Sequence, residues 1–460
     1  MSRVLAVALI PALVLAALWN WAGERASSRP VVTVPTVEQG AAWPDSDAAS
    51  IALSWRRVAD AVVADETADE LRDGLDRLTA GVDDRTCLVV DTGSSVVVAS
   101  DAALNLGPVQ SVVVAAAGLI LLGPDHRPMT AVFGSPPVDG IVDGDLILLG
   151  GGDALLGTRE VSGPPRRHPL PITPLEALVD ALRLTGVERV TGDVVGVSDR
   201  YEDVARPEAW QVPLAEASRV GALLVDRGRS RGGPGNVALD PAQGAARSLL
   251  EVLRDGSIAV DGSARTDSAS ALEGREMLAE VAGETLADVV GGWLTGPDAR
   301  VTADGWAEFA DALLMEIGYA VAGSGTRLGG AAAVSALLEE ISRSEGVAAS
   351  GWEPTADLRD GPGLDAGSTS SCGTLAWALA TIESLGEESG RPIGLDVTEG
   401  DRRRAVVAEL PGETRTRIVV IGDPGTVADL VDSAQGLDGL ITGASTVTAE
   451  QLAPLMTGGG

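Results

Sequence analysis

The stretch Asp143-Gly-Asp-Leu-Ile-Leu-Leu-Gly-Gly-Gly-Asp153 places a short apolar run directly before three glycines and a carboxylate. Four consecutive apolar residues bounded by turn-forming residues predict a buried strand over residues 146–149. The glycines lack the lysine of a phosphate-binding loop and the spacing of a dinucleotide-binding motif. We therefore expect residues 150–152 to form a tight turn at the end of a buried strand.

Upstream of this stretch the sequence predicts a hairpin, a helix and a further strand. Residues 87–100 contain two apolar strands joined at Asp91-Thr92-Gly93-Ser94, which is typical of a hairpin turn. Residues 111–122 are apolar on nearly every face, which predicts a helix buried in the core. A strand is expected over residues 129–133, and an amphipathic helix over residues 49–78 before the hairpin.

Downstream, helix-start patterns alternate with short apolar strands. Thr173-Pro174-Leu175-Glu176 has the pattern of a capping box with Pro at the first helical position. A strand pair is expected within residues 189–196, and Asp240-Pro241 predicts another capped helix. Helices are expected between residues 284 and 340, and a strand over residues 417–422 with a helix after it.

The composition excludes several functions. All 34 residues counted as Lys or Arg are Arg, so the chain has no lysine. The formal charge of −32 argues against nucleic acid or anionic lipid as a partner. A GC-rich genome would explain much of the bias toward Arg. A guanidinium nevertheless stays protonated and cannot act as a general base, so chemistry that needs a lysine base is closed to this chain.

The N-terminus carries an almost unbroken apolar run from Val4 to Trp19. Such a run is a signal peptide or a short membrane anchor. No small-x-small cleavage site follows it, and Trp19 and Trp21 are typical of a membrane interface. We expect an uncleaved anchor within residues 1–26, a linker rich in Pro, Val, Ser and Thr over residues 27–48, and an extracytoplasmic body.

Cys87 and Cys372 are the two cysteines of the sequence. In an exported protein a lone pair favours a disulfide over a metal site, with two buried free thiols as the alternative. A bridge between them would close a very long loop and contribute about 4–5 kcal/mol. No motif indicates a cofactor or a metal.

An ordered set of short segments covers the chain from about residue 78 to residue 379. Beside the opening stretch, the segments are Cys87-Leu-Val-Val90, Ala115 through Leu119-Ile-Leu-Leu-Gly-Pro-Asp125 to His126-Arg127, Gly192-Asp-Val-Val-Gly196 with Asp199-Arg-Tyr201, Val220-Gly-Ala-Leu-Leu-Val-Asp226, Glu316-Ile-Gly318 with Gly323-Ser-Gly-Thr326, and Asp360-Gly-Pro-Gly-Leu364 with Cys372. Together they resemble the D-alanyl-D-alanine carboxypeptidase/endopeptidase family (peptidase family S13, penicillin-binding proteins) in its actinobacterial form.

The resemblance implies a fold and a domain order. The fold is a penicillin-recognising serine-hydrolase-like fold of the α/β (α+β) class, with an all-helical part and an inserted smaller domain. The first part of the main domain would cover residues 49–158 and the inserted domain residues 159–284. The second part of the main domain would cover residues 285–460.

The family cleaves the terminal peptide bond of peptidoglycan stems by acyl transfer through a serine. The nucleophile stands in Ser-x-x-Lys at a helix start, where positions i and i+3 share a face and the amine can take the hydroxyl proton. Ser-x-Asn relays a proton and contacts a substrate amide, and Lys-Thr-Gly on a strand attracts the substrate carboxylate. This sequence departs from all three motifs.

Counting back from Leu119 places Pro108 at the nucleophile and Ser111 at the lysine of the first motif. Proline offers no nucleophile. If Ser111 were a displaced nucleophile, it would have no base, because the residue three positions later is Val114. A hydroxyl that caps the helix start is the favoured alternative for Ser111.

The second and third motifs are degenerate as well. The third motif is best placed on a strand over residues 404–408, where Val406-Val407-Ala408 replace Lys-Thr-Gly. The nearby Arg402, Arg403 and Arg404 either attract a carboxylate or form a solvated basic turn, and the turn is the favoured interpretation. The second motif has two possible placements, and neither supplies the Ser and the Asn. The placements are Pro297-Asp298-Ala299, counted forward from Trp293, and Gly305-Trp306-Ala307, counted back from Leu313.

Three coincident losses indicate a pseudoenzyme. We expect a membrane-tethered protein that binds peptidoglycan stem peptides or a cell-wall or membrane protein, and no nucleic acid. The alternative is an active serine-type D-Ala-D-Ala carboxypeptidase with non-standard catalytic residues, which predicts covalent labelling by a penicillin.

Other motif-like patterns are better explained by local structure. Asp91-Thr92-Gly93-Ser94 matches an aspartic-protease motif, but no second copy supplies the partner carboxylate, so turn chemistry explains it. His126 and His168 lack a Gly-x-Ser-x-Gly elbow. We expect His126 to bond locally in the exit turn of the buried helix, and residues 368–371 to form a loop and a helix cap before Cys372.

Overall fold

The computed structural model describes most of the chain between residues 80 and 430 and leaves out the expected N-terminal anchor, linker and first helix. The described residues are 80, 82–83, 85–91, 96–100, 102–161, 170–202, 204–210, 217–229, 237–295, 305–343, 354–385, 395–399, 403–410, 416–422 and 425–430.

One antiparallel sheet joins segments from both ends of the described chain. Its strand order is β15-β16-β17-β1-β2, and the predicted hairpin forms its β1–β2 edge. Cys87 pairs with Ile421 across β1 and β17, so the expected strand near residue 417 is confirmed. The strands are β1 (Cys87–Asp91), β2 (Val96–Ser100), β15 (Leu395–Glu399), β16 (Arg403–Leu410) and β17 (Thr416–Gly422).

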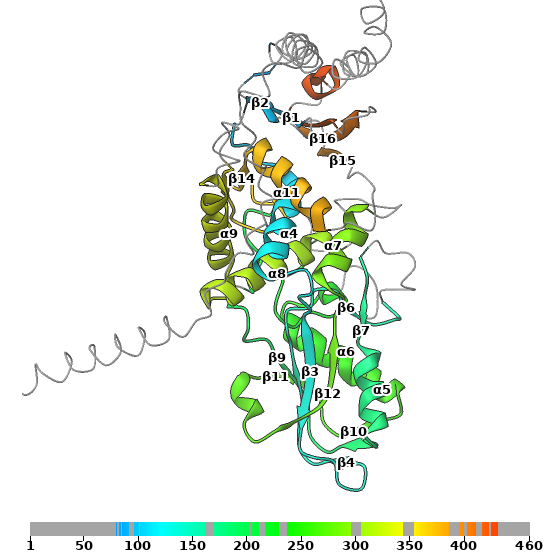
Figure 1. Cartoon of the computed structure of the whole chain (residues 1–460). Coiled ribbons are helices and arrows are strands. Elements are labelled where there is room, and N and C mark those ends of the chain that lie inside the picture. The colour runs from blue at the N-terminus through cyan, green and yellow to red at the C-terminus, as the bar shows by residue number, and fades with distance from the viewer. Residues whose placement is uncertain are drawn as a thin grey trace, which may run out of the picture. The chain divides into compact units, whose positions relative to one another are not determined.

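Helix α4 (Gln110–Leu121) is the centre of the larger core. Every residue from Gln110 to Leu119 is buried, as the sequence predicted, because a helix with no polar face must be covered on all sides. Figure 1 shows α4 beside α7, α8 and α11, each of which packs against it. The surrounding helices are α7 (Leu286–Thr295), α8 (Trp306–Ile317), α9 (Arg327–Ser342) and α11 (Cys372–Leu385).

A disulfide ties this helical core to the sheet. Cys87 of β1 and Cys372 of α11 are bonded, with 5.8 Å between their Cα atoms, so the bridge is confirmed and the free-thiol alternative is wrong. Both residues are fully buried in the same hydrophobic cluster as the valines of α4. Ser371 accepts a hydrogen bond from the Thr374 backbone N–H at 3.2 Å, which confirms the predicted cap of α11.

The second core lies under a smaller mixed sheet with the order β11-β9-β5-β3-β12. Helix α6 packs on β9 and β11, and α5 packs on β12. Asp240 caps α6 by accepting from the Gln243 N–H at 3.2 Å, as predicted. The elements are β3 (Met129–Gly134), β5 (Leu146–Leu149), β9 (Val194–Val197), β11 (Ala264–Thr266), β12 (Glu276–Ala282), α5 (Glu176–Leu184) and α6 (Pro241–Asp255).

Short strands and turns complete the described fold. Residues 425–430 form the helix expected after β17. The short strands are β4 (Ile141–Val142), β6 (Leu156–Gly157), β7 (Thr173–Pro174), β8 (Arg189–Val190), β10 (Ala259–Val260), β13 (Ala356–Asp357) and β14 (Thr369–Ser370). The 3₁₀ turns are η1 (Gly107–Val109), η3 (Asp226–Gly228) and η4 (Ala269–Leu272), and a π-helical turn, η5, covers Gly318–Ala322.

The smaller sheet contains strands from both sides of the predicted domain boundary at residue 159. β3 pairs with β12 and β5 pairs with β9, so strands that precede residue 159 share one sheet with strands that follow it. The predicted domain limits stay a prediction, but strand pairing joins residues 129–149 to the region expected to be the insert.

Two local predictions were wrong. Thr173 and Pro174 form strand β7, and α5 begins at Glu176 with Leu175 at the N-cap and no side-chain cap. Pairing with β6 overrides the local capping pattern, because the Thr173 N–H donates to the Leu155 carbonyl oxygen at 3.0 Å. The strands within residues 189–196 do form, but β8 and β9 belong to different sheets.

The glycine turn of the opening stretch forms as expected, and its backbone packing explains the glycines. Gly152 has φ +92°, a conformation that favours glycine. A Cβ atom at Gly151 would stand 1.8 Å from the Met129 carbonyl oxygen. Within the described residues, no helix has both the length and the apolar character that crossing a bilayer requires.

The disulfide predicts a measurable loss of stability when it is removed. Replacing both Cys87 and Cys372 by Ala should lower the free energy of unfolding by about 3–5 kcal/mol, because the bridge restricts the unfolded chain over a separation of 285 residues. Urea unfolding measures the difference. A mass increase of the native protein after alkylation without reductant would contradict the bridge.

Candidate functional site

The start of α4, where the family keeps its nucleophile, has no exposed hydroxyl at the predicted positions. Pro108 lies buried in η1, one turn before α4. Ser111 is 1% exposed, and its hydroxyl donates to the Pro108 carbonyl oxygen at 2.5 Å. The predicted capping role is wrong in detail, because the hydroxyl bonds a carbonyl and no side chain caps α4. Ser111 is therefore a core residue whose hydroxyl is engaged.

The loop around Asp360 packs directly against this helix start. The Gln110 side-chain amide donates to the Asp360 carbonyl oxygen at 2.7 Å. A Cβ atom at Gly363 (φ +73°) would stand 2.1 Å from the Gly107 carbonyl oxygen. The segment that carries the family-like Asp360-Gly-Pro-Gly-Leu364 sequence thus covers the first turn of α4.

The Asp360 carboxylate organises that loop. It accepts from Trp210 Nε1 at 2.8 Å, from the Leu364 N–H at 2.8 Å and from the Ser368 hydroxyl at 2.8 Å. Burial raises the pKa of Asp360 above its usual value, while the Ser368 hydrogen bond favours the charged form. The sequence marked this segment as family-like but assigned no role to the carboxylate.

The structure describes only one placement of the second motif. Pro297, Asp298 and Ala299 lie outside the described residues. Gly305 is the N-cap of α8 with φ +91°, and Ala307 is buried beside Trp210. Neither Gly305 nor Ala307 offers a side chain that could relay a proton.

The predicted strand of the third motif lies inside the sheet. Val406 of β16 is paired with Val420 of β17 on one side and with Asp396 of β15 on the other. Strand β15 lies within contact distance of η1. Its sequence Leu395-Asp-Val-Thr-Glu399 has no lysine.

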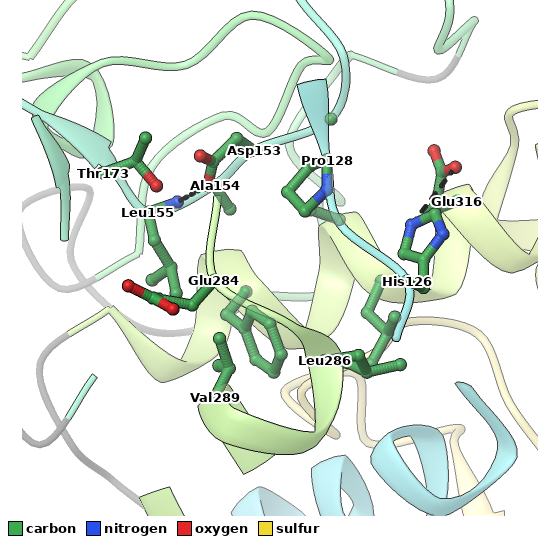
Figure 2. A pocket seen from close by; sticks show the side chains of 14 residues that line it. His126, Pro128, Asp153, Ala154, Leu155, Thr173, Glu284, Leu286, Val289 and Glu316 are labelled. Carbon is green, nitrogen blue, oxygen red and sulfur yellow. Dashed lines mark hydrogen bonds and ion pairs between the residues drawn. The ribbon is translucent and has the colours of Figure 1, made fainter. Parts of the chain in front are cut away.

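A pocket lies beyond the opposite end of α4, with an empty volume of about 480 Å³ including the part open to solvent. Figure 2 shows Asp153 on one wall, His126 beside Glu316 on the other, and Leu286 and Val289 across from them. The lining residues are His126, Pro128, Gly152, Asp153, Ala154, Leu155, Thr173, Glu284, Leu286, Val289, Phe309, Ala312, Leu313 and Glu316.

One wall of the pocket holds a neutralised carboxylate. Glu316 accepts from Arg200 Nε at 2.7 Å and Nη2 at 2.5 Å, and from the Tyr201 hydroxyl at 3.1 Å. The His126 N–H donates to the Gly123 carbonyl oxygen at 3.2 Å, which confirms the expected local bond, and His126 Nε2 lies 3.7 Å from Glu316 Oε1. Burial lowers the pKa of His126, which keeps the imidazole neutral near pH 7.

The other wall holds a carboxylate that forms no ion pair with any described residue. Asp153 is 4% exposed, and burial raises its pKa from 3.8 to about 6. Its Oδ1 accepts from the Leu155 N–H at 2.9 Å. Thr173 lies near and favours the charged form, but no described residue makes a hydrogen bond of good geometry to Oδ2. The sequence identified Asp153 only as the end of a turn.

The fold is similar to that of solved penicillin-binding proteins. Penicillin-binding protein 4 (dacB) from Haemophilus influenzae is similar, with a TM-score of 0.58 and 15% identity over 79% of this chain and 98% of that one. The same protein with a bound β-lactam matches with a TM-score of 0.53 and 15% identity, over 80% of this chain and 99% of that one. This identity supports the fold and transfers no residue role.

A family model matches part of the sequence. Residues 87–231 match the model of the D-Ala-D-Ala carboxypeptidase 3 (S13) family. The matched residues are less than half of the chain, so the match shows a likeness to the S13 family over this part of the sequence. No curated protein matches the sequence.

The buried carboxyl of Asp153 predicts a pH-dependent stability difference. A folded-state pKa of about 6 against 3.8 means that the folded protein holds the proton more tightly. The resulting stability is present below pH 3.8 and is lost as the pH rises through about 6, a loss of up to about 3 kcal/mol. Asp153→Asn cannot titrate, so the variant should gain stability relative to the native protein by about 1–3 kcal/mol between about pH 5 and about pH 7.5.

Urea unfolding of both proteins at the two pH values tests this expectation. Glu280→Gln, on the exposed side of β12, is the matched control because it removes a carboxylate that is not buried. An equal stability difference at both pH values for Asp153→Asn would contradict the expectation.

Proposed function

We propose that this chain is a membrane-tethered, extracytoplasmic D-Ala-D-Ala carboxypeptidase-like protein that has lost acyl transfer. It acts in cell-wall metabolism by binding peptidoglycan stem peptides or a cell-wall protein. The observation that carries the proposal is the start of α4, where Pro108 occupies the nucleophile position and Ser111 is buried with its hydroxyl engaged.

Other hydroxyls near the helix start do not offer a substitute nucleophile. Ser368 is fully buried and donates to Asp360 Oδ1 at 2.8 Å. Ser370 is fully buried and donates to the Thr355 carbonyl oxygen at 3.2 Å. No lysine stands anywhere in the sequence to act as a base. An activated serine needs both a free hydroxyl and a base within hydrogen-bond reach.

A role in binding is supported by the framework that remains around this position. The Gln110–Asp360 hydrogen bond and the close approach of Gly363 to Gly107 hold the loop against the helix start. Strand β15 lies beside η1. A frame of this kind can hold a peptide without cleaving it, because binding and bond cleavage depend on different groups.

Loss of acyl transfer predicts no covalent labelling by a fluorescent penicillin. The full-length protein should carry no label on a denaturing gel, because acylation needs a serine nucleophile. An active penicillin-binding protein run in parallel shows that the reagent works. Labelling that disappears in Ser111→Ala would establish the active-enzyme alternative, and labelling that survives in Ser111→Ala would place the nucleophile elsewhere. Either result would overturn the proposal.

Non-covalent peptide binding is the next expectation. A stem peptide that ends in D-Ala-D-Ala should raise the Tm of the full-length protein, since a ligand that binds only the folded state stabilises it. The same peptide amidated at its C-terminus is the control for recognition of the carboxylate. Co-purification of a cell-wall protein with no shift for either peptide would support the partner role instead.

Tethering is proposed from the apolar run between Val4 and Trp19. Deletion of residues 1–26 should move the protein from the membrane pellet to the supernatant of a cell fractionation. Deletion of the linker residues 27–48 is a matched control that should leave it in the pellet. A protein that remains in the pellet without residues 1–26 would contradict the tether.

A further inference from the structure

We infer that the pocket beyond the C-terminal end of α4 binds a small organic ammonium ion, with the carboxylate of Asp153 as its counter-ion and an apolar wall for its body. Helix α4 has 12 residues, so this pocket is separated from the degenerate motif at the helix start by the length of the helix, about 18 Å. The inference does not depend on the proposed loss of acyl transfer.

Asp153 is the first reason. Its carboxyl is buried in the pocket wall, Oδ1 accepts from the Leu155 N–H, and Thr173 lies near, but no described residue donates a hydrogen bond of good geometry to Oδ2. Burying a carboxylate is costly unless a cation or a donor satisfies it. A Cβ atom at Gly283 would stand 3.1 Å from Oδ2, so glycine at that position leaves Oδ2 less crowded.

The charge balance of the pocket is the second reason. The negative charge of Glu316 is balanced by an ion pair with Arg200, and the Tyr201 hydroxyl donates a hydrogen bond to Glu316. Glu284 stands exposed at the rim and adds a second negative charge to that of Asp153. The described lining residues include no Arg, so the pocket favours a cation from outside.

The shape of the lining decides what kind of cation fits. The side chains of Leu286, Val289, Phe309 and Leu313 form an apolar surface opposite the carboxylate. A divalent metal prefers several oxygen ligands, whereas the described residues hold no group of three metal-ligating side chains. One carboxylate beside an apolar wall is suited to a single ammonium group on a hydrocarbon body.

An ammonium group of this kind has two sources, a free amine or an amine carried on a peptide. The test uses n-pentylammonium for the first and N-acetyl-lysine-N-methylamide for the second, with n-pentanol as the uncharged analogue. Each is titrated into the full-length protein at about pH 7.5, where the Asp153 carboxyl is ionised. Calorimetry and Tm shifts report binding.

We expect at least one ammonium probe to bind, and n-pentanol to bind at least about tenfold more weakly, as loss of a charged hydrogen bond implies. Asp153→Asn should weaken ammonium binding about tenfold. The matched variant Glu280→Gln, which removes a carboxylate outside the pocket, should bind as the native protein does. Stronger binding of the peptide amine than of the free amine would identify a peptide as the source.

Equal affinity of the native protein and of Asp153→Asn for the ammonium probes would overturn the inference. So would the absence of binding by both probes. Either result would mean that the Asp153 carboxylate is satisfied by water alone. If Asp153→Asn fails to fold, the native protein at about pH 5 supplies the comparison, because Asp153 is then largely protonated. The other charged or titratable groups that face the pocket are His126, Glu284, and Glu316 with Arg200 and Tyr201. Ammonium binding that is as strong at about pH 5 as at about pH 7.5 would also overturn the inference.

Discussion

Burial of helix α4 is the constraint on which the rest of the larger core depends. Residues 110–119 have no polar face, so the helix is stable only when other elements cover it on every side. Helices α7, α8 and α11 pack against it, and the bond between Cys87 and Cys372 ties α11 to the sheet. Segments nearly 300 residues apart are thereby brought around one helix, and each end of that helix presents a different environment.

The two ends differ in how their polar groups are satisfied. At the start, the Ser111 hydroxyl and the Asp360 carboxylate are both hydrogen-bonded within the protein, so they hold the helix start and its covering loop in place. Beyond the other end, one oxygen of Asp153 has no hydrogen bond of good geometry from any residue that the structure describes, and the pKa of Asp153 is raised. A perturbed carboxyl in a pocket is the kind of group that proteins use for binding, whereas a fully bonded one stabilises structure.

Sequence reasoning succeeded where periodicity and local chemistry agree with packing. The buried helix, the strands over residues 129–134 and 146–149, and the caps by Asp240 and Ser371 were all predictable. It failed at Thr173, because pairing between β6 and β7 outweighs a capping pattern that is local to four residues. The placement of the third motif on β16 stays a prediction, whereas the contact between β15 and η1 is a property of the assembled sheet that the sequence does not show.

The sequence alone determines which side chains are present: the chain has no lysine, and Pro108 stands before its buried helix. The environment of each carboxylate follows from contacts between distant residues. Glu316 is matched by Arg200, which lies 116 residues away in sequence, while Asp153 meets an apolar wall built from α7 and α8. Burial and charge pairing depend on neighbours in space, so the Asp153 pocket emerges only once the helices and the smaller sheet are packed together.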